Sequence, residues 1–495
     1  MSIMTLMLII GVVALIFTVV MVSMLKAHKS ILTTYLQNFT GILFIFSGWV
    51  KAVDPMGTAF KMVDYFTEFE ATFKETAMSF IAPIFPYLSE HALAFAIFMI
   101  IFEIILGIML LLGDRPKLTS WLFFLLVLFF TVLTGFTFLT GYVPMDKNFF
   151  SFSEWTDYVS TNMRVRDCGC FGDFIKLDPK ISFFKDLFLM IPAIYFLFKN
   201  GEFHQLLTQK SRNLTLLFST FFLILYCIYN FYWDEPHVDF RPFRNGANIA
   251  AIQKAEKESS AAVQVLTMRM KNKKTGEIKN IPYGEYMKNL SALTEEYETI
   301  EQIKTEPTII PTKISEFSIT DFDGEEKSDL YLANKNAHIM VPIYKAKYKA
   351  VHQKRMVKDS VFTTDTVRIE GEKDSFQLVK NFVDVKDREE DFYETVWDES
   401  FIATLKSVIK PLQDAALKDN ITISIVVSGI DADKAKSLAS VTGINAQYLT
   451  GDEKLIKTIM RSNPGIILWK DGVLLHKWHY KKFPGWEKAK AEFLH

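Results

Sequence analysis

The first half of the chain consists of long apolar runs separated by short polar loops. Runs of about twenty apolar residues are long enough to cross a hydrocarbon core of about 30 Å as helices. The pattern predicts six spans, at residues 3–25, 36–53, 91–112, 119–141, 182–198 and 214–232. Beyond residue 233 the apolar runs are short, and Lys, Asp and Glu become frequent. We therefore expect an all-α membrane bundle over residues 1–233, followed by a water-exposed half.

Basic residues in alternate short loops orient these spans, because such loops stay in the cytoplasm. The basic residues concerned are Lys26, Lys29, Arg115, Lys117, Lys199, Lys210 and Arg212. The remaining loops then face outward: residues 54–90, the segment between the fourth and fifth spans, and everything after residue 233. We expect a multi-pass protein in contact with the lipid bilayer. The net charge of −1 and the lack of a basic block interleaved with aromatic residues argue against nucleic-acid binding.

The second half alternates strand and helix patterns and predicts an α/β domain. Residues 234–311 read as a polar linker and a hairpin that turns at Thr275 and Gly276. Three predicted strands follow, AHIMVPIY, ITISIVVSGI and NAQYL, and the helix DADKAKSLASV precedes the third. The helix DEKLIKTIM, the strand pair within SNPGIILWKDGVLLHKWH and a last helix from Trp486 complete the order.

This order resembles a thioredoxin-like domain of the TlpA-like branch, over residues 312–495. The resemblance implies that Pro464 is the cis-proline found beside the active site of that fold. Where such domains carry Cys-x-x-Cys, this chain has a charged insertion at about residues 347–397 and no cysteine. Because the thiolate is the attacking species in disulfide exchange, the domain is expected to bind or dock, or to be a structural relic.

The stretch RVRDCGCFGDF, between the fourth and fifth predicted spans, carries two of the three cysteines, Cys168 and Cys170. Two cysteines separated by one residue close a ring only with strain, and a strained disulfide is more oxidising than a relaxed one. The pair is therefore a candidate for redox exchange, with a static disulfide as the alternative. A metal site is not expected, since zinc takes four ligands and neither a third cysteine nor a histidine lies near.

The residues around the two cysteines fit an exchange site. Arg164 and Arg166 are candidates to stabilise a thiolate, while Asp167 and Asp173 oppose them. The other supporting positions are Gly169 and Gly172, which give a partner sulfur room to approach, and Phe171 and Phe174, which suit the head-group region.

Charged residues also occur within the predicted spans. Glu103 lies midway along the third span, where a carboxylate is costly unless it is neutral, paired or facing a polar cavity. Lys51 and Asp54, near the end of the second span, are either its partners or interfacial residues. Structural pairing and a proton site both remain open. Four glycines allow close helix approach: Gly41, Gly48, Gly107 and Gly135.

These segments resemble known families. SGWVKAVDP, followed by a helix with Glu103 and Gly107 that ends in LLLGD, is similar to the DoxX family of four-helix membrane proteins. DCGCFGD resembles the thiol motif of the related MauE family, and together the likeness covers residues 36–198. HVDFRPFRNGANI, at residues 237–249, looks like the DoxX-type proteins of the Bacteroidota. The chain departs from these families in its first and sixth spans and its long soluble half.

The resemblance implies redox chemistry in the cell envelope, with a quinone as the plausible membrane electron acceptor. It also implies a bacterial inner membrane and a periplasmic second half. The resulting hypothesis is a thiol–disulfide redox protein that passes electrons between a periplasmic thiol partner and the membrane through Cys168 and Cys170. The alternative is a non-catalytic, membrane-anchored docking subunit of an envelope complex.

Overall fold

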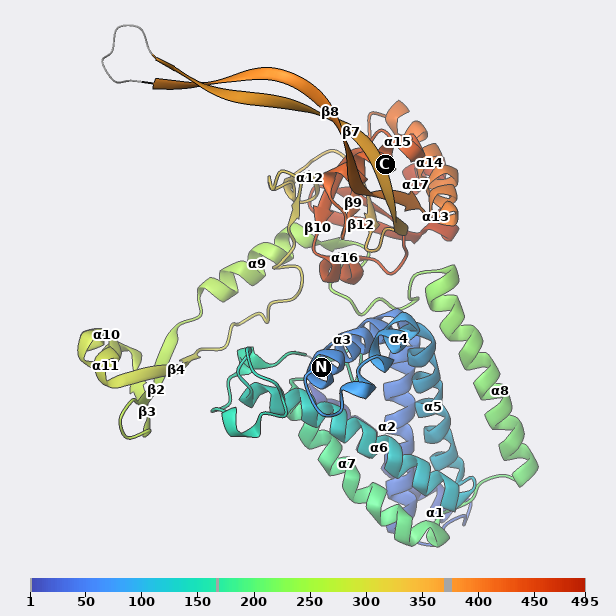
Figure 1. Ribbon diagram of the computed structural model, residues 1–495. Coiled ribbons are helices and arrows are strands. Elements are labelled where there is room, and N and C mark those ends of the chain that lie inside the picture. Colours follow the sequence, from blue (N-terminus) through green and yellow to red (C-terminus); the bar gives the residue numbers. More distant parts are fainter. Residues whose placement is uncertain (1, 166–168, 369–375, 495) are drawn as a thin grey trace.

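The computed structural model describes residues 2–165, 169–368 and 376–494. A helical bundle is formed by the first half of the chain, and a β-rich domain by the second half (Figure 1). The helix α8 (Gln209–Ile228) runs along one side of the bundle and leads into the connection between the two parts.

Apolar helices dominate the first half. Within the described residues, five helices are long and apolar enough to cross a membrane. They are α1 (Ile3–Ser23), α5 (Ala92–Leu112), α6 (Pro116–Leu139), α7 (Pro179–Lys199) and α8. The predicted spans at these places are confirmed as helices, and α7 begins three residues before the predicted residue 182. The chain is therefore a multi-pass membrane protein by the length and composition of its helices.

The remaining predicted span, residues 36–53, belongs to the helix α2 (Ile31–Val53), which is too polar to meet the same criterion. Several of its polar side chains form hydrogen bonds inside the bundle. The Gln37 amide donates to the carbonyl of Leu110 at 3.1 Å, and the Asn38 amide donates to the hydroxyl of Thr18 at 3.0 Å. Since an unsatisfied polar group is costly in lipid, these bonds allow a polar helix to occupy the bundle.

Three of the expected glycines lie where α2 meets α5. A Cβ atom built on Gly107 lies 2.8 Å from the carbonyl oxygen of Gly41, and one built on Gly48 lies 2.4 Å from the side chain of Ile104. The helix backbones therefore approach too closely here to admit a side chain.

Replacing Gly107 with alanine should destabilise the bundle. The added methyl group meets the backbone of α2, which cannot move aside as a flexible side chain would, so we expect a loss of about 1–3 kcal/mol. Thermal unfolding in detergent measures this loss. Gly201→Ala is the matched control, because a Cβ at Gly201 meets nothing within 4 Å. Equal melting temperatures for the two variants would contradict the proposed close contact.

The predicted outward loop at residues 54–90 contains two helices, α3 (Pro55–Lys74) and α4 (Ile84–Glu90). They cover the end of the bundle that faces the β-rich domain (Figure 1). The connection between α6 and α7 packs against α3, because the Asn148 amide donates to the carbonyl of Thr72 at 2.8 Å. This connection contains the stretch RVRDCGCFGDF, residues 164–174, which we name the thiol segment. Its described residues and α3 therefore share one end of the bundle.

The β-rich domain is organised around a sheet that, among the described residues, has the order β1-β12-β11-β6-β9-β10-β5. β6, β9 and β10 run parallel, and the other neighbours pair antiparallel. The strands are β1 (Ala247–Asn248), β5 (Ile319–Thr320), β6 (His338–Ile343), β9 (Thr422–Val427), β10 (Gln447–Gly451), β11 (Gly465–Lys470) and β12 (Val473–His479).

Both faces of this sheet are buried. Along β11, Ile466 and Leu468 face one core, and Ile467 and Trp469 face the other. The first core is completed by α13 (Glu399–Thr404), α14 (Lys410–Lys418), α15 (Ala432–Thr442) and α17 (Trp486–Phe493). The second is completed by α9 (Ile249–Ala261), α12 (Asp329–Leu332) and α16 (Glu453–Ile459). Helices on both faces explain why the strands read as continuous apolar runs.

Two further sheets extend from this domain. The predicted hairpin is confirmed as β2 (Val265–Asn272) and β3 (Ile278–Pro282), joined by β4 (Tyr297–Lys304) and the short helices α10 (Tyr283–Lys288) and α11 (Leu290–Glu296). The charged insertion forms a long antiparallel ribbon of β7 (Tyr348–Arg368) and β8 (Phe376–Trp397). The ribbon projects far from the domain (Figure 1).

Candidate functional site

The thiol segment makes a tight turn at the end of the bundle. Gly169 and Gly172 have φ values of +62° and +52°, a backbone conformation that glycine adopts without steric cost. The amide of Gly172 donates to the carbonyl of Gly169 at 3.1 Å, and Phe171 is buried in the core of the bundle. The turn therefore presses this segment onto the helices. Three predicted site residues, Arg166, Asp167 and Cys168, lie outside the described residues.

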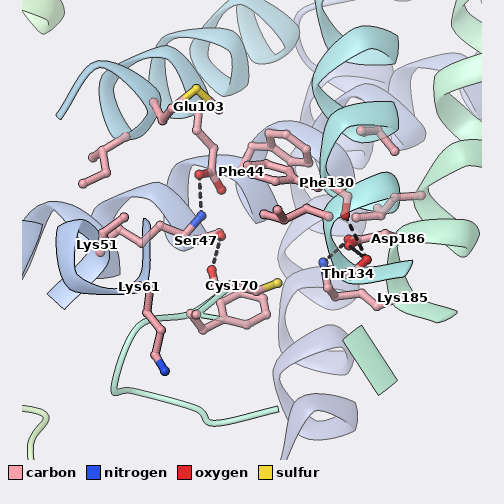
Figure 2. A pocket seen from close by; sticks show the side chains of 18 of the residues that line it. Phe44, Ser47, Lys51, Lys61, Glu103, Phe130, Thr134, Cys170, Lys185 and Asp186 are labelled. Carbon is pink, nitrogen blue, oxygen red and sulfur yellow. Dashed lines mark hydrogen bonds and ion pairs between the residues drawn. The ribbon is translucent and has the colours of Figure 1, made fainter. Parts of the chain in front are cut away.

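Cys170 lies beside an intramembrane cavity. The hydroxyl of Ser47 on α2 donates to the Cys170 carbonyl at 2.9 Å, which holds the turn against this helix. Figure 2 shows the Cys170 sulfur on the side of Lys185 and Asp186, which belong to α7. Phe44 and the other cavity-lining residues of α2, α5 and α6 surround this space. The sulfur is therefore directed toward the membrane helices.

Two buried ion pairs line the cavity. Lys51 of α2 and Glu103 of α5 approach to 2.5 Å, and both side chains are almost fully buried. Lys51 is thus the partner that Glu103 requires. On α7, Lys185 pairs with Asp186, which also accepts a hydrogen bond of 2.9 Å from the Thr134 hydroxyl. Each buried charge has a neighbour of opposite sign, which lowers the cost of placing it among apolar helices.

The surroundings of Cys170 determine its reactivity. Burial raises the pKa of the Cys170 thiol, and Lys185 is the strongest of the influences that oppose this rise. Lys51 acts in the same direction as Lys185, and the two carboxylates beside these lysines act against them. Because the thiolate is the nucleophile, reduced Cys170 is a weak nucleophile at neutral pH.

The chemistry of the cavity suits a quinone ring, but its size does not. Its lysine ammonium groups and the Thr134 hydroxyl are donors suited to quinone carbonyls, and Phe44 and Phe130 supply apolar walls. Its volume of about 70 Å³ holds a few water molecules. A cavity that admits benzene measures about 150 Å³. A quinone ring therefore does not fit the cavity in this conformation.

The other predicted site residues have partners elsewhere. Arg164 forms an ion pair with Glu68 of α3 at 3.7 Å and donates to the carbonyl of Lys147 at 2.5 Å. The Phe174 ring packs on Phe46 at 5.6 Å, and it also contacts Phe240. These contacts fasten the segment to α2, α3 and the chain that follows α8.

Asp54 and Asp173 meet at the guanidinium of Arg461, which belongs to the β-rich domain. Asp54 also caps α3 by accepting from the amide of Gly57 at 3.0 Å. The Asn463–Pro464 peptide bond, two residues beyond Arg461, is cis. Among the described site residues, one group therefore lies at the intramembrane cavity and another lies at the junction with the β-rich domain.

Sequence reasoning missed several residues of the site: Ser47, Thr134, Lys185, Asp186 and Arg461. A signal existed for two of them. The adjacent charges of Lys185 and Asp186 interrupt an otherwise apolar run, FFKDLF, near the start of a predicted span. Charged residues at such a depth normally face a bundle interior. Arg461 carries no comparable signal, because a single arginine between a predicted helix and a predicted strand reads as an ordinary loop residue.

Fold and site together define a multi-pass membrane domain with buried charges and a thiol segment at one end. Residues 29–144 match the family model described as "Methylamine utilisation protein MauE". The match covers α2 to α6, including Lys51 and Glu103, and ends before the two cysteines. These residues therefore form a MauE-like membrane domain. No curated protein and no solved structure matches the chain.

Proposed function

We propose that this protein is a thiol–disulfide redox protein of the bacterial inner membrane. It passes electrons between a periplasmic thiol partner and the membrane through Cys168 and Cys170. The observation that carries the proposal is the position of the Cys170 sulfur beside an intramembrane cavity lined by two ion pairs. The MauE-like domain supports an accessory role in a redox-related pathway. Reactive cysteines commonly lie beside charged residues that change the pKa of the thiol.

The exchange transfers two electrons from the partner's two thiols to the Cys168–Cys170 disulfide. A thiolate of the partner attacks the Cys168–Cys170 disulfide and forms a mixed disulfide with one cysteine, while the other leaves as a thiolate and takes up a proton. The partner's second thiol loses its proton and breaks the mixed disulfide. The partner gains a disulfide, and the Cys168–Cys170 pair gains two electrons and two protons.

The two cysteines have different roles in this scheme. We assign the partner side to Cys168, because the Cys170 sulfur is directed toward the membrane cavity. Cys170 is then the leaving group in the first step. Lys185 and Lys51 are the cations that act on its developing thiolate, and burial favours its protonation afterwards.

Return of the pair to the disulfide requires a two-electron acceptor in the membrane. A quinone is the class that the family resemblance suggests. The cavity does not fit a quinone ring in this conformation. We therefore propose a quinone as the acceptor but assign it no binding site.

For the β-rich domain we propose a thioredoxin-like fold with a binding role. Its support is the parallel pairing of β6 with β9, the antiparallel pair β11–β12, the helices on both faces and the cis bond at Pro464. Residues 234–495 contain no cysteine, so this domain supplies no thiol. Its placement after the last span fits the periplasmic side of the membrane.

A docking function is the second candidate, and the β7–β8 ribbon favours it. The ribbon exposes large side chains of types that are often buried, including Met356, Phe382 and Tyr393. Exposed apolar patches mark sites of protein interaction. A docking subunit would use the bundle as an anchor and leave the cysteines in a fixed state.

The redox state of Cys168 and Cys170 in cells separates the two functions. We expect a mixture of dithiol and disulfide that shifts toward the dithiol when quinone synthesis is blocked, seen as a mass shift after alkylation. A membrane-impermeant maleimide added to intact spheroplasts should label the reduced pair, as the outward orientation requires. A pair that stays fully oxidised under both conditions would contradict the proposal and favour docking.

A further inference from the structure

One guanidinium connects three parts of the molecule. Arg461 lies between α16 and β11 and is almost completely buried. Its Nε and Nη2 atoms contact the carboxylate of Asp54 at 2.6–3.0 Å, and Nη2 also donates to Asp173 at 3.1 Å. Asp54 follows Lys51 by three residues, and Asp173 follows Cys170 by three residues. The β-rich domain therefore holds both the α2–α3 corner and the thiol segment.

The backbone of Arg461 is held as firmly as its side chain. Glu235, in the segment after α8, accepts hydrogen bonds from the amides of Arg461 at 3.2 Å and of Ser462 at 2.8 Å. The same Glu235 pairs with Arg241 at 2.8 Å, and Arg241 pairs with Asp239 at 2.7 Å. Arg461 thus belongs to a network of buried charges, in which losing one member leaves another without its partner.

The positive charges of this network lower the pKa of two of its carboxylates, Asp54 and Asp239. Burial opposes the ionisation of Asp54, but Arg461 and Arg241 outweigh burial and hold the pKa of Asp54 below its usual range. The pKa of Asp239 is likewise lowered, because Arg241 and Lys477 outweigh its burial. The bond between Asp54 and Arg461 is therefore an ion pair.

The thiol segment separates two hollows. On one side lies the intramembrane cavity beside Cys170, and on the other lies a cleft of about 470 Å³ between α3, the thiol segment and α16. Gly169 lines both, whereas Gly172, Asp173 and Arg461 line the cleft. The cleft is as large as a typical small-molecule site and large enough for a side chain of a partner protein.

We propose that Arg461 is a positioning residue that keeps residues 169–174 closed between these two hollows. The β-rich domain would then control access to Cys170 by holding or releasing Asp173. This inference rests on the proposed function, since it concerns access to the same cysteine pair. The partner class is a thiol-bearing polypeptide that displaces the β-rich domain from this contact.

The geometry explains why arginine occupies this position. Its planar fork bonds one carboxylate through two nitrogens and reaches a second carboxylate with the same Nη2 atom. A lysine would keep the charge but holds it as a single point, so it cannot bind Asp54 and Asp173 with the same geometry. Arg461→Lys should therefore give an intermediate result.

The test measures alkylation of Cys170 in the full-length protein in lipid nanodiscs. A Cys168→Ala background leaves Cys170 as the sole thiol of the segment, and Cys227 is fully buried. In the reduced protein, Arg461→Gln should raise the rate of modification by iodoacetamide by about tenfold, a usual size for coupling between sites. Lys454→Gln is the matched control, because Lys454 pairs with Asp64 at 3.5 Å across the same contact without touching the thiol segment.

Asp173→Asn provides the second variant. It releases the thiol segment but leaves Arg461 paired with Asp54, so it remains informative if Arg461→Gln fails to fold. We expect a similar rise in rate, and no further rise when both substitutions are combined. Parental rates in Asp173→Asn and in folded Arg461→Gln would overturn the inference. The assay reports access and not turnover, so it is distinguishable from a failure of the redox proposal in cells.

Discussion

Replacing Cys170 with alanine should trap the partner protein on Cys168. In the reverse direction of the proposed exchange, the Cys168 thiolate attacks the disulfide of the oxidised partner and forms a mixed disulfide, while the partner's second cysteine leaves as a thiolate. Cys170 would then break this mixed disulfide, so without Cys170 the adduct on Cys168 persists. We expect a thiol-sensitive adduct on non-reducing gels of membranes from cells that express Cys170→Ala. Catalysed disulfide exchange in cells should be lost completely, because a single cysteine cannot form the disulfide.

Two further variants show whether the adduct forms on Cys168. Cys168→Ala should give little or no adduct, because Cys170 faces the cavity and burial raises its thiol pKa. The double variant should give none. An adduct confined to Cys168→Ala would reverse the roles of the two cysteines. If both single variants give no adduct and cells keep full function, the bond is only structural and the docking function takes over.

Glu103→Gln should be among the most destabilising single substitutions in the bundle. It removes the carboxylate that lies 2.5 Å from Lys51 and leaves a buried ammonium group without its ionic partner. Breaking a buried pair in this way costs about 3–5 kcal/mol. Thermal unfolding in detergent measures the loss, and Glu90→Gln, at an exposed position, is the control.

The double variant Lys51→Met, Glu103→Met distinguishes a structural role of the ion pair from a role in proton transfer. Replacing both charges with apolar side chains of similar size should restore most of the stability, because the desolvation cost disappears along with the attraction. If exchange activity returns with stability, the pair is structural. If activity stays low in the stable double variant, the pair also handles protons. An unchanged melting temperature for Glu103→Gln would contradict the buried pair.

Much of the membrane half could be predicted from the sequence, because the length of an apolar run shows whether a helix can cross the hydrocarbon core. The helix α2 shows the limit of that reasoning. Its bonds from Gln37 and Asn38 are made to neighbouring helices, so its polarity is compensated only in three dimensions. The small size of Gly41, Gly48 and Gly107 predicted close helix approach, whereas the pairing of α2 with α5 is known only from the structure.

The site was only partly accessible from the sequence. The need of Glu103 for a partner could be predicted, and Lys51 was one of two candidates. Arg461 lies more than 280 residues from Asp173 along the chain, so their contact depends on how two folded parts meet. The charged segment after β6 also gave no sign of a β ribbon, because its apolar residues do not recur at every second position and so define no apolar face.

The β7–β8 ribbon extends the surface of the protein far from the β-rich domain (Figure 1). Its strands contain 21 and 22 residues. At about 3.3 Å per residue such a strand extends for about 70 Å, more than twice the thickness of a hydrocarbon core of about 30 Å. At the ribbon's base, Tyr348 packs on Trp397 with ring centroids 5.5 Å apart. Under the proposed docking function, a protein bound along the ribbon would remain within about 70 Å of the ribbon's base.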